Sequence, residues 1–356
     1  MPESNKENLT WDLSPLFTGD DDPKIEVAKK GAEVATLAFV NKWQGREDYL
    51  REPAVLKEAL DEYNDLQSKS GLDGGVGYYF GLRQSTDQDN PTLKAKNQII
   101  HDFVIRLANQ IQFFMLRVAK IPLGEQEKLL NFPALAPYKH LLERLFVEAK
   151  HLLSEQEEKI LNLKADIASG AWQRLTANFI AKEEHEGKSF SEMMSLIDDR
   201  DTLVRDSAAA WLNQIFNKHL EVGEAELNAI LQNKKVDDEL RGFARPDQAR
   251  HLGDDLETPV VDAMLEAVSA RFDLSKRFYA LKAKLFGLPQ LKYHERNLPY
   301  GEVDKKYSFA ESVALVGSVL HKLDSDFGKI FDRFITRGQV DVYPKKGKTS
   351  GAFCAG

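Results

Sequence analysis

Residues 153–175 have the sequence LSEQEEKILNLKADIASGAWQRL, and this stretch decides the fold class. Ser154 and Glu157 have the spacing of a capping box, in which each side chain satisfies a free backbone N–H of the first helical turn. Apolar residues then recur every three or four positions, at Ile160, Leu163, Ile167, Ala171 and Leu175. This period places them on one face of an α-helix, so the stretch predicts an amphipathic helix.

Two later stretches show the same helical signals. Thr258-Pro259 predicts a helix start, because proline at the first helical position loses only an N–H that had no partner. Apolar residues continue to Gly287, which predicts one long helix, or two helices with a break near Asp273. Ser308 begins a second capping box, and apolar residues follow it at Val313, Val316, Leu320, Leu323, Phe327 and Phe331.

Strand signals are sparse by comparison. The run LKYHERNLPY at 291–300 is short and bounded by proline, and SGAFCAG at 350–356 could form an extended edge. The sequence therefore predicts a mainly α protein with a small β element near the C-terminus. We expect a multi-helical N-terminal domain at residues 1–190 and the beginning of a second domain at 191–356, since a charged stretch at 179–194 suggests a junction.

Composition narrows the classes of function and the expected compartment. The 356 residues carry a net charge of −8, which disfavours a general nucleic-acid binder with a basic face. No apolar run reaches the length of a membrane span. The polar N-terminus lacks the apolar core of a signal peptide, so the expected compartment is the cytoplasm. Cys354 is the one cysteine, which excludes a disulfide framework and a CxxC site.

Gly347-Lys348-Thr349 resembles the end of a phosphate-binding loop. Such a loop needs a glycine five positions earlier, where this chain has Val342, and a helix directly afterwards. Neither condition is met. We therefore expect a turn at 344–347 with its lysines in solvent.

The histidine pattern predicts no zinc site within this chain. A helical site needs two histidines four positions apart, as in H-E-x-x-H. His185-Glu186 and His294-Glu295 begin that pattern, but Ser189 and Leu298 stand at the second ligand position.

Other catalytic patterns are absent from the sequence as well. There is no G-x-S-x-G nucleophile motif, and Cys354 is expected to be an inert apolar residue. We therefore predict no catalytic residue. For YHERN at 293–297 we expect a structural turn with a charge pair, because neighbouring side chains of an extended segment point to opposite faces.

Several fragments, taken in order, resemble the M3 peptidases of the oligoendopeptidase F group. They are TWDLSPLF at 10–17, the helix at 153–175, LIDDRDTLVRDSAAAWL at 196–212, YHERNLPYG at 293–301 and VDVYPKKGKTSGAFCAG at 340–356. The last two are the most specific, and together the fragments span nearly the whole chain. Thr349 departs from the family, because many members have arginine at this position.

The resemblance implies a thermolysin-like zinc endopeptidase that cuts short peptides in the cytoplasm. In such enzymes H-E-x-x-H follows the Gly-Ala-Phe segment by a few tens of residues, so the zinc ligands are expected beyond Gly356. Residues 191–356 would be the beginning of the catalytic domain, and the chain would be the N-terminal portion of a longer enzyme, inactive alone. The alternative is a non-catalytic helical scaffold or peptide-binding protein.

One substrate-binding segment is expected within this chain. Gly351, Ala352 and Phe353 could form a strand beside the active site, and an open strand edge can hold a peptide through main-chain hydrogen bonds. The small residues at 351 and 352 would allow close backbone approach. Tight packing against a neighbouring helix is the alternative role for these residues. The oligomeric state stays open.

Overall fold

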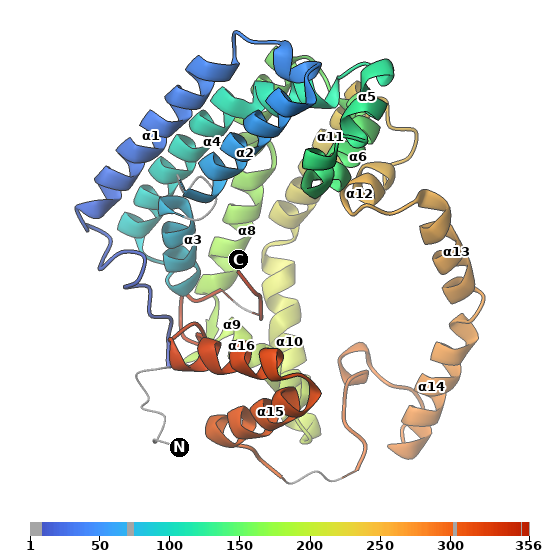
Figure 1. The fold of residues 1–356 in the computed structure, drawn as a ribbon. Coiled ribbons are helices and arrows are strands. Elements are labelled where there is room, and N and C mark those ends of the chain that lie inside the picture. The colour runs from blue at the N-terminus through green and yellow to red at the C-terminus, as the bar shows by residue number, and fades with distance from the viewer. Residues whose placement is uncertain (1–8, 70–74, 302–304, 350, 356) are drawn as a thin grey trace.

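The structure, a computed structural model, describes residues 9–69, 75–301, 305–349 and 351–355. It confirms a mainly α protein (Figure 1). The first helices are α1 Lys24–Trp43, α2 Pro53–Lys69, α3 Val76–Thr86, α4 Pro91–Ala119, α5 Leu123–Leu130, α6 Lys139–Glu148, α7 Glu155–Ala165 and α8 Ala171–Lys182. The later helices are α9 Phe190–Ser195, α10 Thr202–Lys218, α11 Leu220–Arg241, α12 Gln248–Gly253, α13 Thr258–Ser269, α14 Phe272–Leu285, α15 Phe309–Leu323 and α16 Ser325–Thr336.

Shorter elements connect these helices. Short 3₁₀ helices lie at Asp48–Leu50, Pro133–Tyr138, Ala149–His151, Leu196–Asp198 and Tyr293–Glu295, and a π-helical turn lies at Asp166–Gly170. Strands β1 Glu184–His185 and β2 Lys188–Ser189 form an antiparallel pair, with Glu184 opposite Ser189. The turn between them places Glu186 and Gly187 at positive φ.

An aromatic core holds the N-terminal helices together. Phe114 of α4 is fully buried, and its ring centroid lies 5.3 to 5.4 Å from those of Phe39, Tyr49 and Tyr63. Trp43 at the end of α1 is also buried, and its Nε1 donates to Glu62 of α2 at 2.9 Å. Aromatic side chains bury large areas, so this cluster fixes α1, α2 and α4 against one another.

Two smaller cores are separate from this aromatic core. One packs α3 and the start of α1 against α4, with Tyr79, Phe80 and Ile100 buried. The other packs α9 against α10 around Met193 and Trp211. The predicted boundary at residue 190 falls at the first residue of α9. The division into two domains stays a prediction.

The stretch at 153–175 forms its capping box but is not one regular helix. The Ser154 Oγ accepts from the Glu157 N–H at 3.3 Å, and the Glu157 carboxylate accepts from the Ser154 N–H at 2.9 Å. The π-helical turn at Asp166–Gly170 then separates α7 from α8. The predicted stripe is exposed, since Ile160, Leu163, Ile167 and Leu175 are not covered.

The helices predicted at 258–287 and after Ser308 are present, and each run is divided into two helices. Residues 258–285 form two helices, which end before Gly287 in the left-handed conformation. The run after Ser308 also divides, because the Asp324 carboxylate accepts from the N–H groups of Asp326 and Phe327 and so starts α16. We call α13–α14 the arm and α15–α16 the hairpin.

The small β element does not lie near the C-terminus, and this expectation was wrong. The strands occur at 184–189, whereas the described residues from 338 onward contain none. Gly347 and Gly351 adopt positive φ, and Pro344 lacks the N–H that a ladder needs. The segment therefore turns repeatedly instead of running straight.

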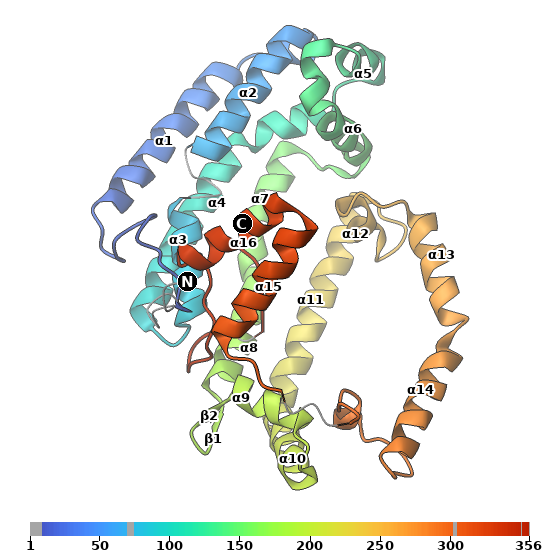
Figure 2. The same cartoon turned by 60° about the horizontal axis from the view of Figure 1, so that its bottom comes forward.

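Figures 1 and 2 show that the arm curves away from the N-terminal helices, and Figure 1 shows the hairpin below α8. α11 runs between the N-terminal helices and the arm. Among the described helices, none combines the length and the hydropathy that crossing a bilayer requires.

Candidate functional site

The C-terminal segment is anchored to the beginning of the chain and to the end of α3. The Asp12 N–H donates to the Gly338 carbonyl at 2.8 Å, and the Val342 N–H donates to the Leu9 carbonyl at 3.0 Å. Farther along, the Thr349 N–H donates to the Ser85 carbonyl at 2.9 Å. These main-chain bonds fix the position of the residues that precede 351–353.

Lys348 is a structural residue of this segment. Its Nζ lies 2.5 Å from the Asp341 carboxylate and 2.8 Å from the Tyr343 carbonyl. A turn is present one residue later than predicted, because the Lys348 N–H donates to the Lys345 carbonyl and closes residues 345–348. The lysines of the predicted turn, Lys345 and Lys346, are exposed as expected, whereas the Lys348 side chain is largely buried against Asp341.

Gly351, Ala352 and Phe353 follow as an exposed, irregular stretch that begins with a bend at Gly351. The Phe353 ring lies edge-on to Trp11, with centroids 5.8 Å apart. The Tyr78 hydroxyl donates to the Ala355 carbonyl at 3.4 Å. Within the described residues, no main-chain hydrogen bond joins Ala352 or Phe353 to another backbone group. Their role in substrate binding stays a prediction.

The segment at 293–297 is a helical turn with charge pairs, as expected. The Glu295 carboxylate is 3% exposed and accepts from the Arg205 guanidinium of α10 at 2.9 Å. His294 Nε2 lies 2.8 Å from the Asp206 carboxylate, which also accepts from Lys292 at 2.5 Å. The segment is thus bound to α10 by two neighbouring ion pairs.

Asp206, His294 and Glu295 are also the group of described residues that most resembles a metal site. Their ligand atoms all lie within 4.8 Å of one another. Two cations already neutralise the two carboxylates, because Lys292 bonds Asp206 and Arg205 bonds Glu295. A divalent ion would have to displace the lysine or compete with the arginine. The group therefore does not fit the zinc ion that the resemblance implies.

Sequence spacing could not reveal this cluster. Arg205 and Glu295 are 90 positions apart, and only the packing of the turn against α10 brings them together. The expectation that His294 and Glu295 point to opposite faces was wrong, because residues 293–295 form a 3₁₀ turn and not an extended segment.

We expect Glu295 to make stability depend on pH. Burial raises the pKa of Glu295, but hydrogen bonds from the Lys292 N–H and Arg205 outweigh it and hold the pKa below its usual 4.5. As the pH falls, the unfolded carboxylate therefore takes up its proton first, which favours unfolding. The stabilisation is complete above about pH 4.5 and is lost as the pH falls through the lower folded pKa.

The measurement is urea unfolding of the wild type and Glu295→Gln between pH 7 and pH 3. The difference in unfolding free energy between the two proteins should shrink as the pH falls. A difference that stays constant with pH would contradict the role given to this carboxylate.

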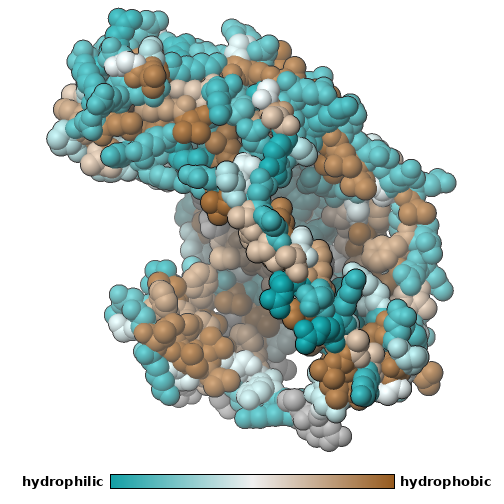
Figure 3. Space-filling view, turned by 90° about the vertical axis from the view of Figure 1, so that its right-hand side faces the viewer, coloured by the Kyte–Doolittle hydropathy of each residue, from teal (hydrophilic) through white to brown (hydrophobic). Residues whose placement is uncertain are grey.

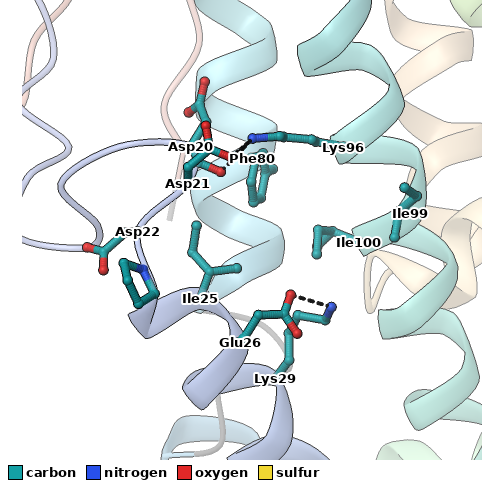
Figure 4. Close-up of a pocket in the computed structure, with 11 residues that line it drawn as sticks. Asp20, Asp21, Asp22, Ile25, Glu26, Lys29, Phe80, Lys96, Ile99 and Ile100 are labelled. Carbon is teal, nitrogen blue, oxygen red and sulfur yellow. Dashed lines mark hydrogen bonds and ion pairs between the residues drawn. The ribbon is translucent and has the colours of Figure 1, made fainter.

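A separate pocket of about 290 Å³ lies between the loop before α1, α3 and α4 (Figure 4). Ile25, Phe80 and Ile100 form its apolar floor. Its charged rim is already paired, since Asp20 accepts from Arg83 at 2.7 and 2.8 Å and Lys96 donates to Asp21. The pocket therefore offers apolar contact without an uncompensated reactive group.

The Asp20 pair also explains the ionisation of its neighbours. The Arg83 guanidinium lowers the pKa of Asp20. Burial, followed by the hydrogen bond to Asp20, raises the pKa of Tyr79 to about 12. Tyr79 is therefore a neutral donor at physiological pH.

Comparison with known proteins adds information that the geometry does not contain. Residues 118–182 match the Peptidase_M3_N family model, described as Oligopeptidase F. The chain is 24% identical to the oligoendopeptidase F homolog of Lactococcus lactis subsp. lactis (strain IL1403), over 98% of this chain and 59% of that protein. It is 23% identical to the group B oligopeptidase PepB of Streptococcus agalactiae serotype III (strain NEM316), over 99% of this chain and 59% of that protein.

Solved structures agree on the fold. The crystal structure of oligoendopeptidase-F from Enterococcus faecium aligns with a TM-score of 0.68 at 13% identity, over 89% of this chain and 66% of that chain. The present chain spans 59% of the length of the two curated relatives. About two-fifths of each relative thus has no counterpart in these 356 residues.

Proposed function

We infer, from the premise that this chain belongs to the oligoendopeptidase F group of the M3 peptidases, that it supplies the helical, peptide-enclosing portion of an oligoendopeptidase. The whole enzyme would hydrolyse internal bonds of short peptides in the cytoplasm. The observation that carries this proposal is the alignment of 98% of this chain with 59% of an oligoendopeptidase F homolog.

We place the zinc ion of that enzyme outside residues 1–356. The sequence has no H-E-x-x-H, and the Asp206 cluster is already compensated by Lys292 and Arg205. When bound, zinc would lower the pKa of its water and polarise the scissile carbonyl. These 356 residues would enclose and orient the peptide and would be inactive alone.

Within this chain, the proposed peptide contact is the exposed stretch Gly351–Ala352–Phe353. Its support is its exposure and the fixed segment before it, which ends with the Thr349 bond to Ser85. A peptide could pair with the backbone of Ala352 and Phe353, a contact that tolerates varied side chains. Phe353 is also 51% exposed, so it can contact an apolar side chain of the substrate.

The test compares residues 1–356 with a longer polypeptide that adds the length found in the relatives. With zinc and a fluorescence-quenched short peptide, the longer polypeptide should cleave internal bonds and residues 1–356 should not. Stoichiometric zinc and cleavage by residues 1–356 would contradict the proposal. Peptide binding without hydrolysis by the longer polypeptide would instead favour the non-catalytic, peptide-binding alternative.

In the longer polypeptide, Ala352→Trp tests the peptide contact. The added ring should raise KM for the peptide about tenfold or more, because it blocks backbone approach, and leave the unfolding midpoint unchanged. Val34→Trp is the matched control, since Val34 of α1 is also exposed and remote in sequence. Unchanged turnover in a stable Ala352→Trp protein would exclude the contact.

A further inference from the structure

The arm carries a long row of uncovered apolar side chains. Ala283 is the one buried residue among the described residues of α13 and α14. Ten large apolar residues of these helices are between 41% and 58% exposed: Val260, Met264, Leu265, Val268, Phe272, Leu274, Phe278, Tyr279, Leu281 and Leu285. In α14, Leu274, Phe278, Leu281 and Leu285 follow the i, i+4, i+7, i+11 spacing of one helix face.

The hairpin has the same property on its outer surface. Its two helices pack tightly on each other, because Gly317 lets the Phe331 ring approach and Gly328 lies directly against His321. Besides charged residues, this packing leaves six large apolar side chains exposed: Leu315, Val316, Val319, Leu323, Phe327 and Ile330. Figure 3 shows a hollowed face of the molecule with apolar residues beside the hollow.

These helices need a partner to be stable. Isolated helices of 12 to 15 residues are marginal in water, and most helical stability comes from packing an apolar face. The arm is held at its ends by polar contacts, in which Arg245 pairs with Asp262 and Lys282 donates to the Arg296 carbonyl. Such contacts fix where the arm lies and leave its apolar row uncovered. Contiguous apolar surface of this kind marks an interaction site.

We propose that the arm and the hairpin form a docking surface for a second polypeptide segment, the one equivalent to the two-fifths of the relatives that this chain does not match. The assignment rests on the proposed function, which requires such a segment. Its matching surface is apolar and helical, with acidic residues at the edge. We expect acidic residues on the partner because interfaces pair opposite charges. In α14 the basic residues outnumber the acidic Asp273: Lys276, Arg277, Lys282 and Lys284.

We therefore expect the arm and the hairpin to bind this segment even when it is supplied as a separate polypeptide. The probe is the part of the Lactococcus lactis relative that this chain does not match, expressed alone. Titration calorimetry should show a one-to-one complex with residues 1–356, and amide exchange in α13 and α14 should slow. The reference is the same probe with the matched part of its own protein, which shows that the probe is competent to dock.

Two apolar-to-charged variants test the surface, with one matched control. Phe278→Asp on the arm and Val319→Asp on the hairpin should each weaken binding about 30-fold or more, as expected for central apolar contacts. Val34→Asp, on an exposed position of α1, should leave binding unchanged. Because all three sites are solvent-exposed, the fold of residues 1–356 should persist, which circular dichroism checks.

The outcomes separate this inference from the proposed function. A complex that forms but does not cleave peptide with added zinc supports the docking surface and counts against the function. If the reference pair binds and residues 1–356 form no complex with the probe, the docking surface is overturned. Self-association of residues 1–356 that Phe278→Asp abolishes also overturns it, because a second copy would then be the occupant.

Discussion

Replacing Arg205 by alanine is expected to lower the unfolding free energy by about 3 to 5 kcal/mol. The Arg205 side chain is 7% exposed, and it bonds Glu295 through two nitrogens and the Arg200 carbonyl through a third. Its removal leaves the buried Glu295 carboxylate without a compensating charge. Urea unfolding followed by circular dichroism and tryptophan fluorescence measures the loss.

Two further variants decide whether the unpaired charge is the cause. Arg250→Ala breaks an exposed pair with Asp254 and should cost only about 0.5 kcal/mol or less. The double variant Arg205→Met with Glu295→Leu should recover most of the loss, because apolar residues can replace a buried ion pair at little cost. A double variant as unstable as Arg205→Ala would show that packing at this position dominates instead.

Phe114→Ala is expected to cost about 3 to 5 kcal/mol, the range for large aromatic deletions in a core. Phe114 is fully buried and contacts three other rings, so the neighbouring helices cannot easily close the cavity. Unlike Arg205→Ala, this variant loosens α1, α2 and α4. Amide exchange should therefore become faster in α1, α2 and α4 for Phe114→Ala, and in α10 for Arg205→Ala.

The controls for Phe114 vary size and exposure. Phe114→Leu keeps most of the volume and should cost about 1.5 kcal/mol or less. Leu123→Ala removes an apolar side chain that is 82% exposed and should change stability by about 0.5 kcal/mol at most. If Phe114→Ala were as mild as Leu123→Ala, the aromatic cluster would not be the main source of stability in the bundle.

Local sequence signals predicted the helices well. The capping boxes at Ser154 and Ser308 and the start at Pro259 each depend on residues within one helical turn. The hydrogen bonds of these helix starts join residues that are neighbours in sequence, so they form whatever the rest of the chain does. The left-handed Gly287 is of the same kind, because only neighbouring carbonyls are involved.

Features that depend on distant partners were not predictable. The Arg205–Glu295 pair and the approach of His294 to Asp206 require the turn at 293–295 to reach α10. The strands lie at 184–189 because Glu186 and Gly187 adopt positive φ and form the turn between them. In the sequence this stretch is rich in charged residues, so it suggests a domain junction. The exposure of the arm could not be predicted either, because apolar residues that recur at helical spacing normally indicate a helix face buried in the core.

The main-chain bonds between Leu9–Asp12 and Gly338–Val342 have a consequence for synthesis. They join residues that leave the ribosome more than 300 positions apart. At about 5 to 20 residues per second, the first segment waits about 20 to 70 s for its partner. During that interval the aromatic bundle can form from its own residues, whereas Leu9 and Trp11 remain uncovered. The closing of the chain on itself is therefore a late step of folding, after the N-terminal bundle is complete.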